Sequence, residues 1–313
     1  MNILLSTDNN YVMPTGVLMH SICQNNENVV YYIFVDPSFS IENKRALEDI
    51  AVGYDCVIHF LCVDLAKLKY MPVGREDQPI HITKAAYFRL FVAELLPKDI
   101  HRVLYLDGDI IVRKSLEKLW DTDLSGYSTG VVHDVNELNH CKSGRLPYPM
   151  NKGYFNSGVL LINLDYWREH NLLQEFMIFA QKNEDILMLH DQDVLNCVLY
   201  DSLMWLPLTY NFENGFLLLS DYISFSPEIQ NEIDKTKYDP AIIHFASADK
   251  PWKITCYHPY VGVWRHYWRM SKWKHDKLYG ENPVSIKDKI RMFALRHCLY
   301  LPKYMYQNCR LKK

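Results

Sequence analysis

The sequence predicts an α/β protein with a mostly parallel, twisted sheet flanked by helices, and with a basic helical appendage at its carboxyl end. Three observations lead to this prediction. Apolar runs of strand length alternate with amphipathic stretches of helical period along most of the chain. Several of these runs end directly in polar residues, as strands do at a ligand-binding edge. Beyond about Val261 the composition becomes basic and aromatic.

The first part of the chain alternates strand and helix. In order, the predicted elements are a strand at Asn2–Thr7, a helix at Met13–Cys23, a strand at Val29–Val35, a helix at Ile41–Ile50 and a strand at Cys56–Val63. Ser40 is the expected N-cap of the second helix, with Glu42 in its first turn. Because β-α-β-α-β order favours parallel neighbours, we expect the carboxyl ends of these strands to share one edge.

The same alternation continues in the middle of the chain. The predicted elements are a helix at Thr83–Leu95 that stops before Pro97, strands at Arg102–Leu106, Tyr127–Val132 and Gly158–Asn163, a helix at Asp165–Gln181, a helix from the polar turn at His190 to Tyr200, and a last core strand at Ala241–Phe245. Asp165 is the expected N-cap of its helix. We place a domain boundary near residue 260.

Composition limits the class of protein. The chain has 313 residues, 49% of them hydrophobic and 23% charged, which is typical of a soluble globular protein. The eight cysteines form no C-x-x-C pair, which indicates a reducing compartment and no structural zinc. Neither a signal peptide nor an apolar run of membrane-spanning length is visible, so we expect a cytoplasmic protein.

Charge is unevenly distributed along the chain. Residues 264–313 contain 13 Lys/Arg and 3 Asp/Glu, a net of +10, whereas the remainder contains 21 and 34, a net of −13. Trp264, Tyr267, Trp268 and Trp273 alternate with basic residues, and 286–300 is amphipathic and basic. This pattern predicts either binding to an anionic membrane surface or a helical appendage packed on the acidic body. Nucleic acid is disfavoured, because the body is acidic and no binding motif is present.

Asp107-Gly108-Asp109 is the sharpest local motif. It follows an apolar predicted strand, and side chains two apart on extended chain point the same way. Two carboxylates can therefore converge on one Mg²⁺ or Mn²⁺ ion. The alternative is an ordinary Asp-Gly turn. His244 ends another predicted strand, where it is either a core residue or a third ligand that favours Mn²⁺, and Lys250 follows it as a diphosphate partner or a solvated charge.

Three further polar segments begin or end predicted elements. Thr7 to Tyr11 follows the first strand and either reads a nucleoside or caps a helix. Asn156-Ser157-Gly158 and Asp191-Gln192-Asp193 either grip sugar hydroxyls or serve as caps and turns.

Taken together, these segments resemble glycosyltransferase family 8, and especially its bacterial UDP-glucose and UDP-galactose transferases of lipopolysaccharide assembly. The matching stretches, in family order over about residues 1–255, are STDNNY, HITKAAYFRL, RVLYLDGDIIV, YFNSGVLLIN, HDQDVLN, LPLTYNF and HFASADKPW. The resemblance implies a GT-A fold in residues 1–260 that binds a nucleotide sugar. Residues 261–313 would be a tail for the membrane surface or the acceptor side.

The resemblance also implies roles for individual residues. By this resemblance, Asp107, Asp109 and His244 would bind the metal, with Mn²⁺ as the expected ion and Mg²⁺ as the alternative. The residues that would bind the nucleotide-sugar donor are Thr7, Asp8, Asn10, Tyr11, Arg89, Asp107, Gly108, Asn156, Ser157, Asp191, Gln192, Ser247 and Lys250. His81 is the acceptor-side candidate. Ser247 departs from the family, which usually has glycine there, and its Cβ is expected to crowd the phosphate; Asn9 replaces an acid found in many relatives.

The implied reaction is transfer of a hexose from a UDP-sugar to a glycan or glycolipid acceptor with retention of anomeric configuration. We expect same-face attack by the acceptor as UDP leaves, with Gln192 and Asp191 positioning the sugar. Asp191 and Asp193 are the chemically better nucleophiles for a double displacement. The alternative function is a catalytically silent binder of a nucleotide or glycan on the same fold. A nucleotidyltransferase or a dinucleotide oxidoreductase is disfavoured, because no glycine-rich loop follows a strand.

Overall fold

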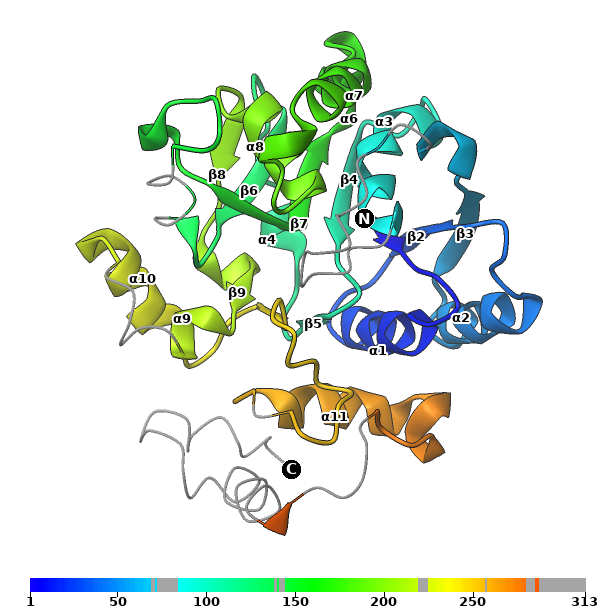
Figure 1. Cartoon of the computed structure of the whole chain (residues 1–313). Coiled ribbons are helices and arrows are strands. Elements are labelled where there is room, and N and C mark those ends of the chain that lie inside the picture. Colours follow the sequence, from blue (N-terminus) through cyan, green and yellow to red (C-terminus); the bar gives the residue numbers. More distant parts are fainter. Residues whose placement is uncertain are drawn as a thin grey trace. The chain divides into compact units, whose positions relative to one another are not determined.

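The computed structural model describes residues 1–68, 71, 84–137, 140, 144–218, 225–256, 258–279 and 285–286. The chain divides into two compact units. Unit 1 comprises Met1–Val12, Glu27–Gly108 and Glu117–Leu206, and unit 2 comprises Met13–Asn26, Asp109–Leu116 and Pro207–Lys313. Each unit has its own sheet (Figure 1).

Unit 1 is built on a seven-stranded sheet in the order β3-β2-β1-β4-β7-β6-β8. Its strands are β1 (Asn2–Ser6), β2 (Val30–Val35), β3 (Val57–Cys62), β4 (Arg102–Leu106), β6 (Thr129–His133), β7 (Phe155–Asn163) and β8 (Leu203–Trp205). All neighbours pair in parallel except β7, which is antiparallel to both β4 and β6. The predicted mostly parallel α/β sheet is confirmed.

Helices cover this sheet and enclose its core. They are α2 (Ile41–Gly53), the 3₁₀ segment η2 (Lys84–Phe91), α3 (Val92–Leu95), α4 (Glu117–Trp120), α6 (Leu164–Glu169), α7 (Leu172–Lys182) and α8 (Asp191–Leu199), with short 3₁₀ turns η1 (Leu65–Leu68), η3 (Met150–Lys152) and η4 (Glu184–Ile186). Trp167 on α6 and Phe176 on α7 are fully buried and meet edge to face at 5.0 Å between ring centroids. Burying two such rings stabilises the packing of α6 and α7 by several kcal/mol, at roughly 1.5–3 kcal/mol per large side chain.

The expected helix at Asp165–Gln181 is wrong in two details. The chain breaks it into α6 and α7 at Asn171, whose φ of 49° is left-handed, a conformation that asparagine tolerates better than most residues. The N-cap of α6 is Asn163 rather than Asp165, because the Asn163 side chain accepts from the Tyr166 amide. The Ser40 cap of α2 is confirmed, since its hydroxyl accepts from the Asn43 amide.

Unit 2 holds a three-stranded sheet in the order β5-β10-β9, made of β5 (Ile110–Val112), β10 (Ile242–His244) and β9 (Phe212–Glu213). Its helices are α1 (Val12–Cys23, whose first residue belongs to unit 1), α9 (Gly215–Leu218), α10 (Pro227–Thr236) and α11 (Val261–Met270), with 3₁₀ turns η5 (Leu208–Tyr210) and η6 (Lys272–His275). Strand β5 is fixed to α1 because the Val112 amide donates to Ser21 Oγ and its carbonyl accepts from Asn25.

The aromatic residues of the basic stretch pack within unit 2. Trp264, Tyr267 and Trp273 are buried, and Trp264 lies 6.0 Å from Trp252 between ring centroids. Three of the rings expected to meet lipid are therefore used in folding. The amphipathic stretch 286–300 lies almost wholly outside the described residues, and the division at residue 260 stays a prediction. None of the described helices is both long and apolar enough to cross a bilayer.

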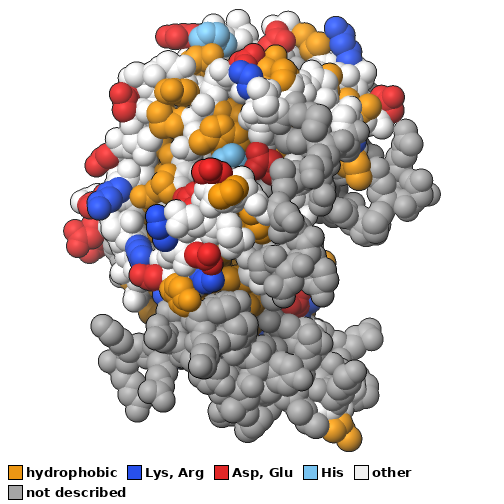
Figure 2. All heavy atoms as spheres, turned by 90° about the vertical axis from the view of Figure 1, so that its left-hand side faces the viewer, with side chains coloured by type: hydrophobic (Ala, Val, Ile, Leu, Met, Phe, Trp, Pro, Cys, Tyr) orange, Lys and Arg blue, Asp and Glu red, His pale blue; other side chains and the backbone are white. Residues whose placement is uncertain are grey.

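Surface charge is mixed on the face drawn in Figure 2. On its described part, Lys/Arg and Asp/Glu side chains lie interspersed, and hydrophobic side chains gather in the upper half.

Cysteine exposure gives a first testable prediction. Cys62 is exposed, whereas Cys197 and Cys256 are buried, and burial raises the pKa of each of these two thiols to about 12. With iodoacetamide near neutral pH, Cys62 should be alkylated roughly 10²-fold or more faster than either buried thiol. Peptide mass spectrometry of the native and urea-unfolded protein measures this. Equal rates for Cys62 and Cys197 in the native protein would contradict the packing described.

Candidate active site

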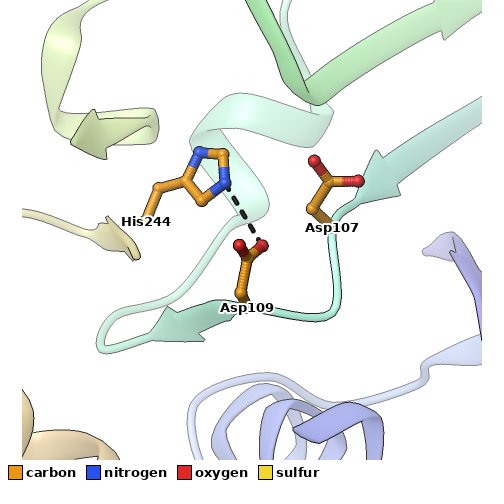
Figure 3. Close-up of side chains that lie close together, drawn as sticks. All are labelled: Asp107, Asp109 and His244. Carbon is orange, nitrogen blue, oxygen red and sulfur yellow. Dashed lines mark ion pairs between the residues drawn. The ribbon is translucent and has the colours of Figure 1, made fainter. Parts of the chain in front are cut away.

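The candidate metal ligands are placed by strand pairing within unit 2. Residue His244 of β10 pairs with Ile110 of β5, and the Phe245 amide donates to the Asp109 carbonyl at 3.0 Å. This register puts His244 Nε2 3.2 Å from Asp109 Oδ1 (Figure 3). On the other side of the ring, Nδ1 lies 2.9 Å from Asn211 Oδ1. A proton on Nδ1, donated to Asn211, leaves the Nε2 lone pair free to bind a cation.

Asp107 is joined to Asp109 through Gly108 alone, so it lies near this pair by chain connectivity. Asp107, Asp109 and His244 each offer one ligand atom, and the three atoms lie within 4.8 Å of one another. Two carboxylates and one imidazole are a donor set that suits a divalent cation. The residues present therefore fit a divalent metal.

Lys250 compensates the charge of Asp109. Its ammonium donates to Asp109 Oδ2 at 2.5 Å and to the Phe245 carbonyl at 2.8 Å. Burial by itself would raise the pKa of Asp109, but the neighbouring Lys250 ammonium holds that pKa below its usual range. The carboxylate is thus ionised, as a metal ligand must be.

Arg89 of η2 links two carboxylates in unit 1. Its guanidinium donates to Asp107 Oδ1 at 2.8 Å, and its Nε lies 3.1 Å from Asp191 Oδ2. It also donates to the Ser157 carbonyl and lies 4.5 Å from the centre of the Tyr105 ring. The Tyr105 hydroxyl also donates to Asp107 Oδ1. Within the described part of the chain, both side-chain contacts of Asp107 therefore fall on one oxygen, which leaves Oδ2 for a cation.

Asp191 is the buried partner of Arg89 at the start of α8. Burial raises the pKa of its carboxyl to about 6, although the Arg89 guanidinium opposes the shift. Its proton is therefore lost near neutral pH rather than near the usual value for aspartate.

This shift predicts a dependence of stability on pH. Because the native carboxyl holds its proton more tightly than the unfolded one, the native state loses stability as pH rises from about 4 to about 6. Asp191→Asn cannot ionise. In EDTA-treated protein, the unfolding temperature of the wild type relative to Asp191→Asn should therefore rise when the pH is lowered from 7 to 5. A constant difference between the two proteins across this range would contradict the raised pKa.

Gln192 is held by a network that sequence reasoning missed in part. Its Oε1 accepts from the Ser157 amide at 2.9 Å, and its Nε2 donates to Asp134 Oδ2 at 3.0 Å. The same Asp134 oxygen accepts from Asn156 Nδ2 at 3.3 Å. Asp134 is buried and directly follows β6, whose carboxyl end shares an edge with that of β4. Its place just after a predicted strand was the signal for it.

Asp193 is not a nucleophile in this arrangement. Its side chain has 0% exposure, and its oxygens accept from five donors. These donors are Arg145 Nη1, Arg145 Nη2, the Tyr154 hydroxyl, and the amides of Met188 and Leu189. All of its accepting capacity is used within the protein, so the alternative of Asp193 as a nucleophile loses its physical basis.

The nucleoside candidates lie after β1. Asp8 Oδ1 accepts from the amides of both Asn10 and Tyr11 at 2.8 Å, so Asp8 does cap this turn. Asn10 is exposed, Tyr11 is half-buried and Thr7 is buried. The capping oxygen is occupied by the protein itself, whereas Asp8 Oδ2 has no contact among those given for the described residues.

The two remaining sequence-predicted positions have different outcomes. Ser247 is half-buried, and its hydroxyl accepts from Asn214 Nδ2 at 2.8 Å and from the Asp249 amide at 3.3 Å. The serine is therefore built into the loop by its own hydrogen bonds. His81 lies outside the described residues.

Comparisons with known proteins identify related sequences and a related structure. The model of the family described as glycosyl transferase family 8 matches residues 2–256. General stress protein A of Bacillus subtilis is 31% identical over 284 residues, 87% of this chain and 94% of its own length. A lipopolysaccharide 1,2-glucosyltransferase of Escherichia coli is 28% identical over 301 residues, 95% of this chain and 86% of its own. The crystal structure of the galactosyltransferase LgtC with donor and acceptor sugar analogues has a TM-score of 0.77 at 24% identity, covering 93% of this chain and all of LgtC.

Proposed function

The chain belongs to glycosyl transferase family 8, and from this premise we propose that it moves glucose or galactose from the UDP-sugar to lipopolysaccharide or another cell-surface glycan. The class of reaction is retaining hexosyl transfer from a UDP-sugar to a glycan, with a divalent metal. The choice of hexose and acceptor is supported by the relatives, one described as a lipopolysaccharide glucosyltransferase and another as a galactosyltransferase.

The observation that carries the proposal is the cluster of Asp107, Asp109 and His244 with Lys250 beside it. We assign the first three as ligands of Mn²⁺, with Mg²⁺ as the alternative, because the imidazole favours the softer ion. When bound, the cation stabilises the negative charge that develops on the departing UDP. Lys250 adds a second positive charge that can bind the diphosphate.

The donor sugar is held by the network of unit 1. Arg89, Asp191 and Gln192 present a guanidinium, a carboxylate and a carboxamide whose positions are fixed by Asp134 and Ser157. These groups match the donors and acceptors of pyranose hydroxyls. The bond from C1 to the β-phosphate oxygen breaks while the acceptor hydroxyl oxygen bonds to C1 on the same face and gives its proton to the departing phosphate. Burial of Asp193 among five donors supports this route over a double displacement through that residue.

The remaining candidates complete the donor site. We assign uridine to Thr7, Asp8, Asn10 and Tyr11, the diphosphate to Gly108, Ser247 and Lys250, and the sugar also to Asn156 and Ser157. The acceptor-side role of His81 stays a prediction.

A donor screen tests this function. UDP release is measured with Mn²⁺ for a panel of UDP-sugars, with and without added glycan acceptor, and repeated with Asp109→Ala. We expect turnover with UDP-glucose or UDP-galactose in the wild type and its loss in the variant. Binding of UDP-sugars without any turnover, under all acceptors, would favour the catalytically silent binder instead.

Lys250 gives a separate prediction about metal binding. Because its ammonium donates to Asp109 Oδ2, a cation that binds this oxygen has to compete with it. Lys250→Met should therefore bind Mn²⁺ without nucleotide roughly threefold to tenfold more tightly, since a charge pair of this kind is worth on the order of 1 kcal/mol or more. Its affinity for UDP should fall. Mn²⁺ titration followed by electron paramagnetic resonance measures the first effect.

Lys253→Met is the matched control, because the Lys253 ammonium donates to a backbone carbonyl, that of Ala248, rather than to a carboxylate. It should leave Mn²⁺ affinity unchanged. If Lys250→Met weakened Mn²⁺ binding, Lys250 would be supporting the ligand set rather than competing with the ion.

We also propose that the basic tail brings the enzyme to the inner face of the cytoplasmic membrane. The net charge of +10 over residues 264–313 supports this. Truncation before α11 is a poor test, because it would remove the buried Trp264 and Tyr267. A full-length variant with Lys287, Lys289, Arg291 and Arg296 changed to Glu should instead lose co-sedimentation with anionic liposomes. Equal sedimentation of the two proteins contradicts the idea.

A further inference from the structure

The turn before α8 has an unfavourable backbone conformation. His190 has φ of 41° and ψ of −106°, a region that residues with a Cβ rarely adopt. Its side chain makes no capping hydrogen bond to the helix. Non-glycine residues persist in such conformations only where the surrounding structure forces them to, and they concentrate at functional sites.

The His190 side chain does not compensate for this conformation by hydrogen bonding. The residue is 3% exposed, and neither ring nitrogen has a hydrogen-bond partner among the described residues. The His190 and Tyr87 rings meet edge to face at 6.2 Å, and in the same described part of the chain the buried Tyr87 hydroxyl has no partner either. Burial therefore lowers the pKa of His190 and keeps the ring neutral. Buried polar atoms without partners destabilise a fold, so stability alone does not explain this turn.

Hydrogen bonds of Asp193 and its ion pair with Arg145 hold the turn in this conformation. The Asp193 carboxylate accepts from the amides of Met188 and Leu189, at 2.7 and 2.8 Å, and so folds the chain back before His190. Arg145 holds that carboxylate through both Nη1 and Nη2, at 2.7 and 2.9 Å, and also donates to the Ile186 carbonyl. A bidentate guanidinium–carboxylate pair fixes both distance and orientation.

The turn positions the two residues that follow it, and both are assigned to binding of the donor sugar. Asp191 and Gln192 follow His190 directly and reach Arg89 and Asp134. The hydrogen bonds of Arg145 described above run to Asp193 and to the Ile186 carbonyl. Through Asp193 and the turn, its guanidinium can act on Asp191 and Gln192.

We propose that Arg145 is a positioning residue for the donor hexose, which it aligns by holding the strained turn at His190 through Asp193. This proposal rests on the function proposed above. It goes beyond that function in assigning a role to a residue of the loop between β6 and β7, outside the family motifs quoted above. Positioning of this kind acts on the sugar and not on the UDP part of the donor.

Comparing the affinity for UDP with the affinity for the intact UDP-hexose separates a positioning role of Arg145 from a general structural role. Arg145→Met is expected to lower the rate of transfer roughly tenfold to 100-fold, because small misplacements of positioning groups cost that much. The affinity for UDP with Mn²⁺ should stay within twofold of wild type, while the affinity for the UDP-hexose changes. Arg145→Lys, which keeps the charge, should recover part of the rate. Calorimetric titration and initial rates measure these quantities.

Arg168→Met is the matched control. Arg168 has a side-chain exposure of 14%, against 13% for Arg145, and donates to backbone carbonyls of the segment before β4, including those of Ala93, Leu96 and Ile100. Its loss should lower the unfolding temperature without changing the ratio of UDP-hexose to UDP affinity. If Arg145→Met, like Arg168→Met, lowers the unfolding temperature without changing the ratio of UDP-hexose to UDP affinity, the positioning role is wrong. If the wild type transfers no hexose from any UDP-sugar, the proposed function fails instead.

The strain itself is tested by two variants at His190. Both His190→Gly and His190→Ala remove the imidazole, but only alanine keeps a Cβ in the strained conformation. We expect the glycine variant to unfold roughly 2 °C or more above the alanine variant. At Gln181, exposed on α7, the order of the same two substitutions should be the reverse. An alanine variant at least as stable as the glycine variant at position 190 would show that the turn is not strained, and would remove the basis of the proposal.

Discussion

Asp109→Asn is expected to lower the rate of hexose transfer by about 10³-fold or more, because several kcal/mol of transition-state stabilisation depend on the metal. Asparagine keeps the shape of the side chain but removes the charge that faces His244 Nε2 at 3.2 Å and the Lys250 ammonium at 2.5 Å. A cation would then meet one carboxylate and one imidazole instead of three ligands. Initial rates with saturating UDP-hexose and Mn²⁺ measure the loss.

Thermal unfolding gives a second readout of the same substitution. A metal that binds only the native state raises the unfolding temperature with its concentration. Mn²⁺ should raise that temperature in the wild type and have little effect in Asp109→Asn. Asp123→Asn is the control, because Asp123 is fully exposed and bonds only Ser125 among its described partners. A variant at Asp109 that still responds to Mn²⁺ as the wild type does would exclude this carboxylate as a ligand.

Arg89→Met is expected to lower the free energy of unfolding by about 3–5 kcal/mol, the usual result of leaving buried charges without a partner. The Arg89 side chain is 8% exposed and lies against both Asp107 and Asp191. Burial by itself would lower the pKa of Arg89, but the neighbouring carboxylates, Asp107 above all, raise it above its usual value, so the guanidinium is charged throughout the accessible pH range. Removing it leaves the buried Asp191 carboxylate and the half-buried Asp107 carboxylate without this positive charge.

Urea unfolding at pH 7 measures this loss, and a double variant identifies its source. Asp191→Asn added to Arg89→Met removes one of the two orphaned charges and should restore part of the stability. Arg113→Met is a control of the opposite kind, since Arg113 pairs with Asp239, whose side chain is 60% exposed. Its loss should cost less than about 1 kcal/mol. If Arg89→Met lost equally little free energy of unfolding, water or a mobile cation would be compensating the two carboxylates in place of the guanidinium.

Local patterns in the sequence were sufficient for most elements of the sheet. The strands at Asn2–Ser6, Val30–Val35 and Arg102–Leu106 were predicted within one residue, because apolar and β-branched runs of this length have few alternatives. The break at Asn171 was not predictable from the helical period of residues 165–181. The period continues across the break, and only packing of α6 and α7 on the core decides where the chain turns.

Local sequence patterns likewise predicted some residues of the candidate site and not others. Asp107 and Asp109 were found because both follow a strand that ends at the ligand-binding edge, and His244 because it ends another. Asp134 was not among the predicted site residues, although its place just after a strand was a signal for it. The bidentate pair of Arg145 with Asp193 had no such signal, because Arg145 lies in the connection between β6 and β7 and Asp193 in the first turn of α8, and no spacing links the two.

The sequence by itself determined the order of strands and helices, the family, and the residue types that can bind a metal and a nucleotide sugar. Tertiary structure alone decided which of these polar groups have free atoms. Asp193 was a chemically reasonable nucleophile until five donors were found around it, and Trp264 and Tyr267 were reasonable lipid contacts until they proved buried. The physical reason is that a side chain's capacity to react or bind depends on its neighbours, and in a sheet protein those neighbours come from distant parts of the chain.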